Sequence, residues 1–146
     1  AKPTMVTLAP AYVFRQKVRF GEMAAVKNML KEGMDINDVG GEASAGKTVR
    51  GWTPLHIACW GSYKPQYDLV IVEQILLAAA KAKQDDMVKN VKDQQSGELP
   101  IDLAKQRLAK IEANPPKPGA DDTAFLEDKR KVEKIIEYLE KGVPAG

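Results

Sequence analysis

The fold is decided by the stretch Gly51-Trp52-Thr53-Pro54-Leu55-His56-Ile57-Ala58-Cys59. Thr53 is one of the residue types that cap the first turn of a helix, and Pro54 suits the first helical position, where an N–H would have no partner. The small side chain of Ala58 allows a neighbouring helix to pack closely. The stretch therefore predicts a short helix that begins at Pro54, ends near Gly61 and packs against other helices.

Helical periodicity recurs on both sides of this helix. Met23, Val26, Met29 and Leu30 follow one another at the three- and four-residue spacing that places side chains on one helical face. Gly33 then ends that helix as a left-handed cap. Strand patterns are nearly absent, so the sequence predicts an all-α fold of three helix–turn–helix pairs. The expected helices cover about residues 11–20, 22–32, 54–61, 68–88, 100–111 and 123–141.

Loops and helix breakers divide the chain into one domain with short ends. Residues 1–10 form an N-terminal arm that contains two prolines, and residues 143–146 form a tail. The domain itself covers residues 11–142. Its three repeats are expected at about 11–50, 51–95 and 96–142, with a Gly-rich polar loop at 37–51 and insertions at 62–68 and 112–123.

The middle repeat resembles a known family. Residues 51–59 are similar to the signature G-x-T-P-L-H-x-A-A of ankyrin repeats, and residues 72–77 (Val-Glu-Gln-Ile-Leu-Leu) resemble the family's V-x-x-L-L-x run. Residues 97–104 give a weaker match. The first repeat lacks the opening signature, as a terminal repeat often does, but its residues 21–37 resemble the family's G-x-x-x-x-V-K-x-L-L-x-x-G-A-D-V-N run. The resemblance covers about residues 11–142 and implies a short ankyrin-repeat array whose middle repeat is the strongest.

The resemblance also implies roles for the signature residues. A histidine in the position of His56 usually bridges neighbouring turns by hydrogen bonds, and the loop at 37–51 corresponds to the protruding finger of the family. Proteins of this family bind other proteins, so the resemblance implies binding rather than catalysis. The residues with an expected structural role are Thr53, Pro54, Leu55, His56 and Ala58.

Composition argues against several classes of site. Hydrophobic residues make up 44% of the chain, which suits a folded domain, and a formal net charge of +2 gives no electrostatic reason to expect nucleic acid or a membrane surface. Cys59 and His56 are the single residues of their types, which excludes an internal disulfide and zinc sites built from cysteine or histidine. The most apolar stretch, residues 69–80, is too short to cross a membrane. We expect no catalytic residue, no metal and no cofactor.

One pattern favours an alternative function, nucleotide binding. Residues 41–48 (Gly-Glu-Ala-Ser-Ala-Gly-Lys-Thr) match the phosphate-loop pattern G-x-x-x-x-G-K-[ST], in which Lys47 would reach the terminal phosphates and Thr48 would bind magnesium. Such a loop needs a buried strand before it and a helix directly after it. Residues 34–40 are polar and turn-like, and Gly51 breaks the chain soon after the pattern, so the sequence favours a finger loop here.

The residues expected to contact a partner lie in and around the middle repeat, because aromatic and arginine side chains commonly anchor protein interfaces. Trp52, together with Arg50, is the first candidate, since its position in the family often faces the binding groove. The alternative is that the aromatic residues pack on the inserted loop at 62–68, and this alternative is favoured for Trp60. The predicted partner-binding residues are Lys47, Arg50, Trp52, Trp60 and Tyr63.

The sequence therefore predicts a non-catalytic protein–protein binding module, an adaptor or scaffold that uses its concave face and finger tips. An alternative is a fixed peripheral subunit of a large assembly, since the array is short and carries long insertions. The chain begins at Ala1 without an initiator Met, and a cleaved targeting peptide would place such an assembly in a plastid or mitochondrion. The predicted location is intracellular, in the cytoplasm or an organelle, and the expected partner is a protein or a larger protein assembly.

Overall fold

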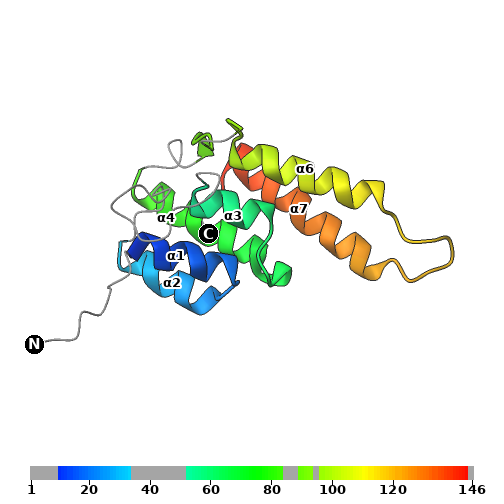
Figure 1. Ribbon diagram of the computed structural model, residues 1–146, viewed down its shortest axis with the longest axis horizontal. Coiled ribbons are helices and arrows are strands. Elements are labelled where there is room, and N and C mark those ends of the chain that lie inside the picture. The colour runs from blue at the N-terminus through cyan, green and yellow to red at the C-terminus, as the bar shows by residue number, and fades with distance from the viewer. Residues whose placement is uncertain (1–9, 34–51, 84–88, 94–95, 145–146) are drawn as a thin grey trace, which may run out of the picture.

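The computed structural model of the chain describes residues 10–33, 52–83, 89–93 and 96–144. Within these ranges the secondary structure is helical and contains no β-strand, which confirms the all-α prediction. Figure 1 shows the arrangement of the elements. They are α1 (Pro10–Arg19), α2 (Met23–Lys31), α3 (Pro54–Trp60), the short 3₁₀ helix η1 (Pro65–Tyr67), α4 (Asp68–Lys81), α6 (Pro100–Ala113) and α7 (Thr123–Lys141).

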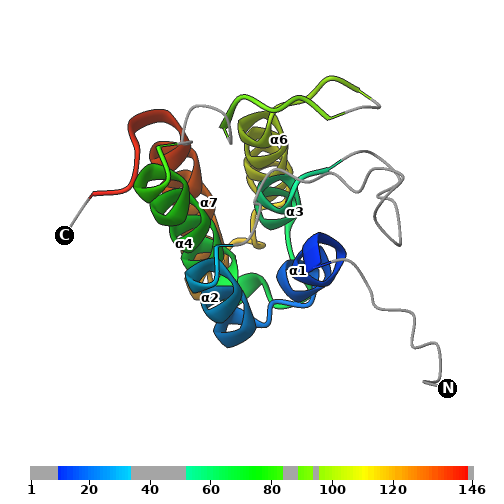
Figure 2. The ribbon, with the colours of Figure 1, turned by 90° about the vertical axis from the view of Figure 1, so that its left-hand side faces the viewer.

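The helices form three pairs that stack side by side in two layers. α1 pairs with α2, α3 with α4, and α6 with α7. In one layer α3 contacts α1 on one side and α6 on the other, and in the second layer α4 contacts α2 and α7. Figure 2 shows these layers nearly end-on, with α1, α3 and α6 in one row and α2, α4 and α7 in the other. This is an ankyrin-like helical array of the predicted three pairs.

The core lies between the two layers and joins all three pairs. It is aliphatic with few aromatic rings, as the composition implies. The middle pair contributes most of it, because α3 and α4 have neighbours on both sides. Its buried hydrophobic members are Phe14, Val18, Val26, Trp52, Leu55, Ile57, Ala58, Cys59, Ile71, Val72, Ile75, Leu76, Ala79, Leu103, Ala104, Ile135 and Leu139.

One predicted helix boundary requires correction. α4 ends at Lys81 rather than near residue 88, and its last turn is closed by the N–H of Ala82 on the carbonyl of Ala78. Lys83 then adopts a left-handed φ of 59°. This end could not be predicted, because residues 82–88 contain neither glycine nor proline as a signal of helix termination.

The third pair is longer than the others and projects beyond them. α6 has 14 residues where α3 has 7, and both begin with a proline at equivalent ends of the array. Since a helix rises about 1.5 Å per residue, α6 continues about 10 Å past the end of α3. Figure 1 shows α6 and α7 leaving the body of the array as a hairpin. The loop between them covers residues 114–122, so the predicted insertion at 112–123 is shortened because both helices extend into it.

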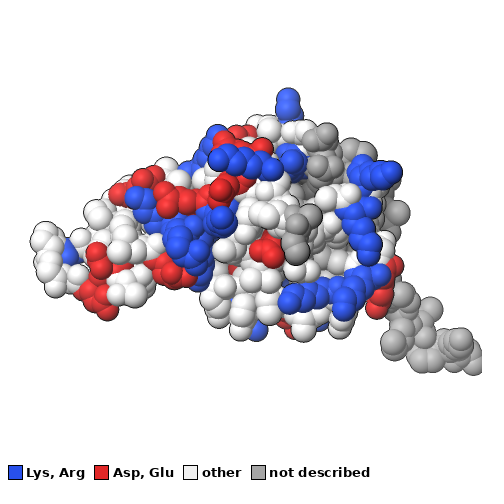
Figure 3. All heavy atoms as spheres, turned by 180° about the vertical axis from the view of Figure 1, so that it is seen from behind, with Lys and Arg blue, Asp and Glu red and all other residues white. Residues whose placement is uncertain are grey.

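The Lys-rich faces of this hairpin carry acidic residues as well. Figure 3 views the molecule from behind and shows basic and acidic side chains interspersed over the projecting part. Lys129 pairs with Glu112, and Arg130 with Glu127, at N–O distances of 3.7 and 2.8 Å. These exposed pairs are typical of a solvated helix surface and contribute little to stability.

Candidate functional site

The N-terminus of α3 is built by residues of the stretch 51–59. Thr53 has extended backbone, and its side-chain oxygen accepts a hydrogen bond from the backbone N–H of His56 at 3.3 Å. Pro54 occupies the first helical position. Thr53, Pro54, Leu55 and Ala58 are all buried, so this end of the helix is closed by the chain itself and lies inside the array.

His56 uses both ring nitrogens to join two turns of the chain. Its Nδ1 accepts from the backbone N–H of Thr53 at 3.2 Å and lies 2.8 Å from the Thr53 hydroxyl. Its Nε2 lies 2.9 Å from the carbonyl oxygen of Glu98, which can only accept, so Nε2 carries the proton. Burial lowers the pKa of His56 below its ordinary value, and the bond to Glu98 opposes that shift. The ring is therefore a neutral bridge between the second and third helix pairs.

A second buried polar group, Asp93, organises the turn that His56 contacts. The Asp93 carboxylate accepts hydrogen bonds from the backbone N–H groups of Ser96 and Gly97, at 2.6 and 3.0 Å. It also accepts the indole N–H of Trp52 at 3.3 Å. Burial pushes the pKa of Asp93 up, but these hydrogen bonds outweigh it, and the pKa lies below its ordinary value. Trp52 is consequently tied to the turn between the second and third repeats.

Comparison with known proteins agrees with this geometry. The family model described as "Ankyrin repeat" matches residues 50–86, a range that contains the capped helix and α4. The chain carries an ankyrin repeat. No curated protein and no solved structure matches the chain.

Part of the ankyrin-repeat capping scheme recurs at the start of the third pair with a different side chain. Leu99 precedes α6 in the same extended backbone conformation that Thr53 has before α3. The Asp102 carboxylate accepts a 2.9 Å hydrogen bond from the backbone N–H of Leu99, as His56 does from Thr53. A carboxylate thus replaces the imidazole in this one hydrogen bond, whereas Leu99 lacks the side-chain oxygen with which Thr53 caps α3.

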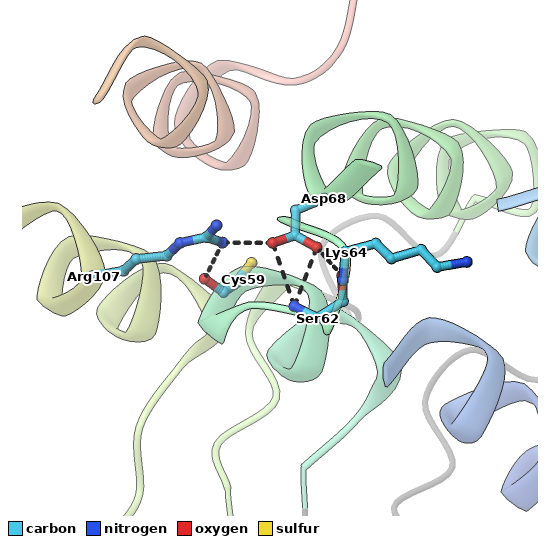
Figure 4. A network of polar contacts seen from close by, with 5 residues as sticks. All are labelled: Cys59, Ser62, Lys64, Asp68 and Arg107. Carbon is cyan, nitrogen blue, oxygen red and sulfur yellow. Dashed lines mark hydrogen bonds and ion pairs between the residues drawn. The ribbon is translucent and has the colours of Figure 1, made fainter. Parts of the chain in front are cut away.

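At the other end of α3, a buried ion pair holds the inserted loop. Asp68, the first residue of α4, is 1% exposed and accepts hydrogen bonds from both the backbone N–H and the hydroxyl of Ser62. Nη1 of Arg107, on α6, lies 2.9 Å from Asp68 Oδ2 and 3.5 Å from the carbonyl oxygen of Cys59. Figure 4 shows this network, which also includes the bond from the Lys64 N–H to the Ser62 hydroxyl. The network therefore ties the loop to α6.

The same network affects two titrating groups. Burial raises the pKa of the Asp68 carboxyl, and the bonds from Ser62 and the charge of Arg107 oppose the rise. Burial also raises the pKa of the Cys59 thiol, whose side chain is fully buried. Since the thiolate is the reactive form, Cys59 is an inert core residue.

The five predicted partner-binding residues have different surroundings. Lys47 and Arg50 lie outside the described residues, as do the finger loop and the phosphate-loop pattern at 41–48. Trp52 is 7% exposed, so its expected role as a partner contact is not supported; it packs against Trp60, with ring centroids 5.8 Å apart. Trp60 is half-buried beneath the amine of Lys110, 4.5 Å from the ring centre. Tyr63 is 69% exposed.

Sequence reasoning missed the residues that carry the buried polar contacts. Asp93 stands three residues before Ser96-Gly97, a spacing at which an aspartate often caps a turn, so a local signal existed. Asp68 and Arg107 have no such signal, because their contact joins residues far apart in the chain. Among the described residues, no group of three or more His, Cys, Asp or Glu side chains is placed to hold a metal ion. None of the helices described is long and apolar enough to cross a membrane.

Proposed function

We propose that this chain is a non-catalytic protein-binding module that acts as an adaptor or scaffold inside the cell. The observation that carries the proposal is the ankyrin repeat, in which the reactive residue types serve the fold. Both nitrogens of His56 are used in hydrogen bonds between turns, and Cys59 is fully buried. Neither side chain is free to act as a general base or a nucleophile.

The contact residues in this proposal are those that remain candidates after Trp52 is removed. Lys47 and Arg50 would act from the finger loop, and Tyr63 from the loop after α3. Trp60 would contribute the exposed part of its ring together with the amine of Lys110. Aromatic and cationic side chains of this kind are enriched among the residues that dominate interface energies.

The test is co-purification of the tagged chain from its native source, identification of the partner by mass spectrometry, and reconstitution of the pair from purified components. We expect direct binding, weakened about tenfold or more by the double variant Lys47→Glu/Arg50→Glu. Lys105→Glu, an exposed lysine on α6, is the matched control and should leave the affinity unchanged. Failure of every purified candidate to bind, together with turnover of a substrate by the chain, contradicts the proposal.

An exchange experiment on the co-purified complex distinguishes an exchangeable adaptor from a fixed subunit of a large assembly. Labelled chain added to the purified complex should replace the bound chain within hours if the module acts as an adaptor. A chain that remains in constant stoichiometry and does not exchange is a fixed subunit, and the adaptor role would then be discarded.

A further inference from the structure

Three exposed aromatic side chains lie where the helices of the first two pairs turn. Phe20 follows α1, Tyr63 lies in the inserted loop, and Tyr67 ends η1; they are 47%, 69% and 36% exposed. We call these three residues the aromatic edge. Among the described residues, the other large hydrophobic side chain with comparable exposure is Leu126, on the projecting hairpin. Exposed aromatic rings that are grouped rather than scattered mark interaction surfaces.

The two turns that carry the aromatic edge are fastened to each other. The backbone N–H of Tyr63 donates to the carbonyl oxygen of Arg19 at 2.8 Å. The rings of Phe20 and Tyr63 are in contact, with centroids 5.3 Å apart. Gly21 has a left-handed φ of 69°, and a Cβ at this position would lie 2.7 Å from the Cβ of Lys64. The turns therefore meet closely at a position that only glycine allows.

The loop that carries Tyr63 is also held from behind. Ser62, its neighbour, is hydrogen-bonded to the buried Asp68, which is paired with Arg107 of the next repeat. Because the loop is held before any partner arrives, binding through Tyr63 requires little further ordering of the chain. The aromatic edge is thus a preorganised surface, although the residues around it form an insertion relative to the repeat pattern.

The turns of the aromatic edge also carry basic residues, among them Lys17, Arg19 and Lys64. Lys17 pairs with Glu22 at 3.1 Å, so that carboxylate is already neutralised. Arg19 directly precedes Phe20, Lys64 directly follows Tyr63, and neither cation forms an ion pair within the described part of the chain. The two joined turns therefore carry two contacting aromatic rings and two cations without a carboxylate partner among the described residues.

We propose that the aromatic edge binds an acidic peptide segment of a partner protein, in which a leucine or aromatic side chain is flanked by aspartate or glutamate. The inference rests on the proposed protein-binding function and names a surface and a partner chemistry for it. The apolar side chain would pack on Phe20 and Tyr63, and the carboxylates would pair with Arg19 and Lys64. Two cations suit a short acidic segment, whereas a polynucleotide is typically held through about 6–10 phosphates.

The test uses a random short-peptide library displayed on phage and selected on the immobilised full chain. We expect the selected peptides to combine acidic residues with leucine or an aromatic residue. Affinities of the synthetic peptides should fall about tenfold or more for Tyr63→Ala and for Lys64→Glu, as for central interface residues. Lys81→Glu is the matched control, because it reverses the charge of an exposed residue at the far end of α4, about 20 Å from Asp68. It should leave the affinity unchanged.

Several outcomes would overturn the proposal. They are selection of no peptide, selection of peptides without acidic residues, or equal binding to wild type and Tyr63→Ala. Displacement of the peptides by polyuridylic acid would identify an RNA surface, and concentration-dependent dimerisation abolished by Tyr63→Ala would identify a second copy of this chain. If Tyr63→Ala still binds the co-purified native partner while Lys47→Glu/Arg50→Glu does not, this inference fails and the proposed binding function stands.

Discussion

The ion pair between Arg107 and Asp68 offers the sharpest test of how the array is held together. Arg107→Met removes the guanidinium and keeps much of the apolar stem of the side chain. The Asp68 carboxylate then stays buried with its hydrogen bonds from Ser62 but without its cation. The substitution therefore isolates the charge that α6 contributes to the inserted loop.

The expected loss of stability follows from the burial of the pair. Removing one partner of a buried ion pair costs about 3–5 kcal/mol, because the other charge remains buried without compensation. The Arg107 side chain is 18% exposed and Asp68 retains the hydrogen bonds from Ser62. Both facts place the expected loss at the lower end of this range. We expect the free energy of unfolding to fall by about 3 kcal/mol at pH 7, roughly a 150-fold change in the unfolding equilibrium.

The loss of unfolding free energy in Arg107→Met should depend on pH in a characteristic way. The pKa of Asp68 in the folded chain is already raised by burial, and removal of the cation raises it further. A carboxyl group with a raised folded pKa favours the folded state most when it is protonated, and this contribution is lost as the pH rises through the folded pKa. The deficit of Arg107→Met should therefore be largest at neutral pH and shrink as the solution is acidified, since a protonated Asp68 needs no cation.

Urea unfolding followed by tryptophan fluorescence measures this deficit at several pH values between neutrality and the acid limit of the wild type. Asp68→Asn in the Arg107→Met background is the control, because it removes the charge and should abolish the pH dependence of the deficit. A loss below about 1 kcal/mol, the range of an exposed pair, or a loss that stays constant on acidification, would refute the reasoning.

Four further substitutions, the last of them a control, test three other contacts. The pKa of His56 is lowered by burial, so the contribution of the neutral ring to folding stability is complete above about pH 6.5 and is lost as the pH falls through the folded pKa. His56→Gln should remove this decline, which urea titrations at several pH values measure. Trp52→Phe deletes the indole donor to Asp93 and should cost about 1–3 kcal/mol of unfolding free energy, with a loss near zero contradicting the buried hydrogen bond. Gly21→Ala and Gly119→Ala both place a side chain at a left-handed φ, but only the former meets another atom within 4 Å, so its melting temperature should fall further; equal losses would count against close contact between the turns.

Most of the helices could be predicted because their ends have local causes. The start of α3 follows from a capping threonine and a proline, and α2 and α7 end before Gly33 and Gly142, whose φ values are 83° and 86°. Such signals act within a few residues, so a single sequence contains them. The position of His56 is predictable in a similar way, through its resemblance to a repeat signature.

The remaining features depend on contacts that no local pattern records. Trp52 was expected to face a partner because of its place in the repeat, yet it is buried against Trp60 and bonded to Asp93. The pairing of Asp68 with Arg107 arises only when the third helix pair stacks on the second. These contacts could not be predicted because their partners lie far apart in the sequence.

The position of each pair in the array explains why the signature fades away from the middle. α3 has a helix on each side, so its length and its small, capped end are constrained by two neighbours. α6 packs against α3 on one side only within its layer, and it is free to lengthen to 14 residues and to exchange the threonine and histidine for Leu99 and Asp102. Departures from the repeat signature therefore accumulate in the third pair, which projects as a hairpin, and the loop that presents Tyr63 is a separate insertion within the middle repeat. We therefore expect the residues that select a particular partner to lie at those positions, because the signature residues at the start of α3 are buried.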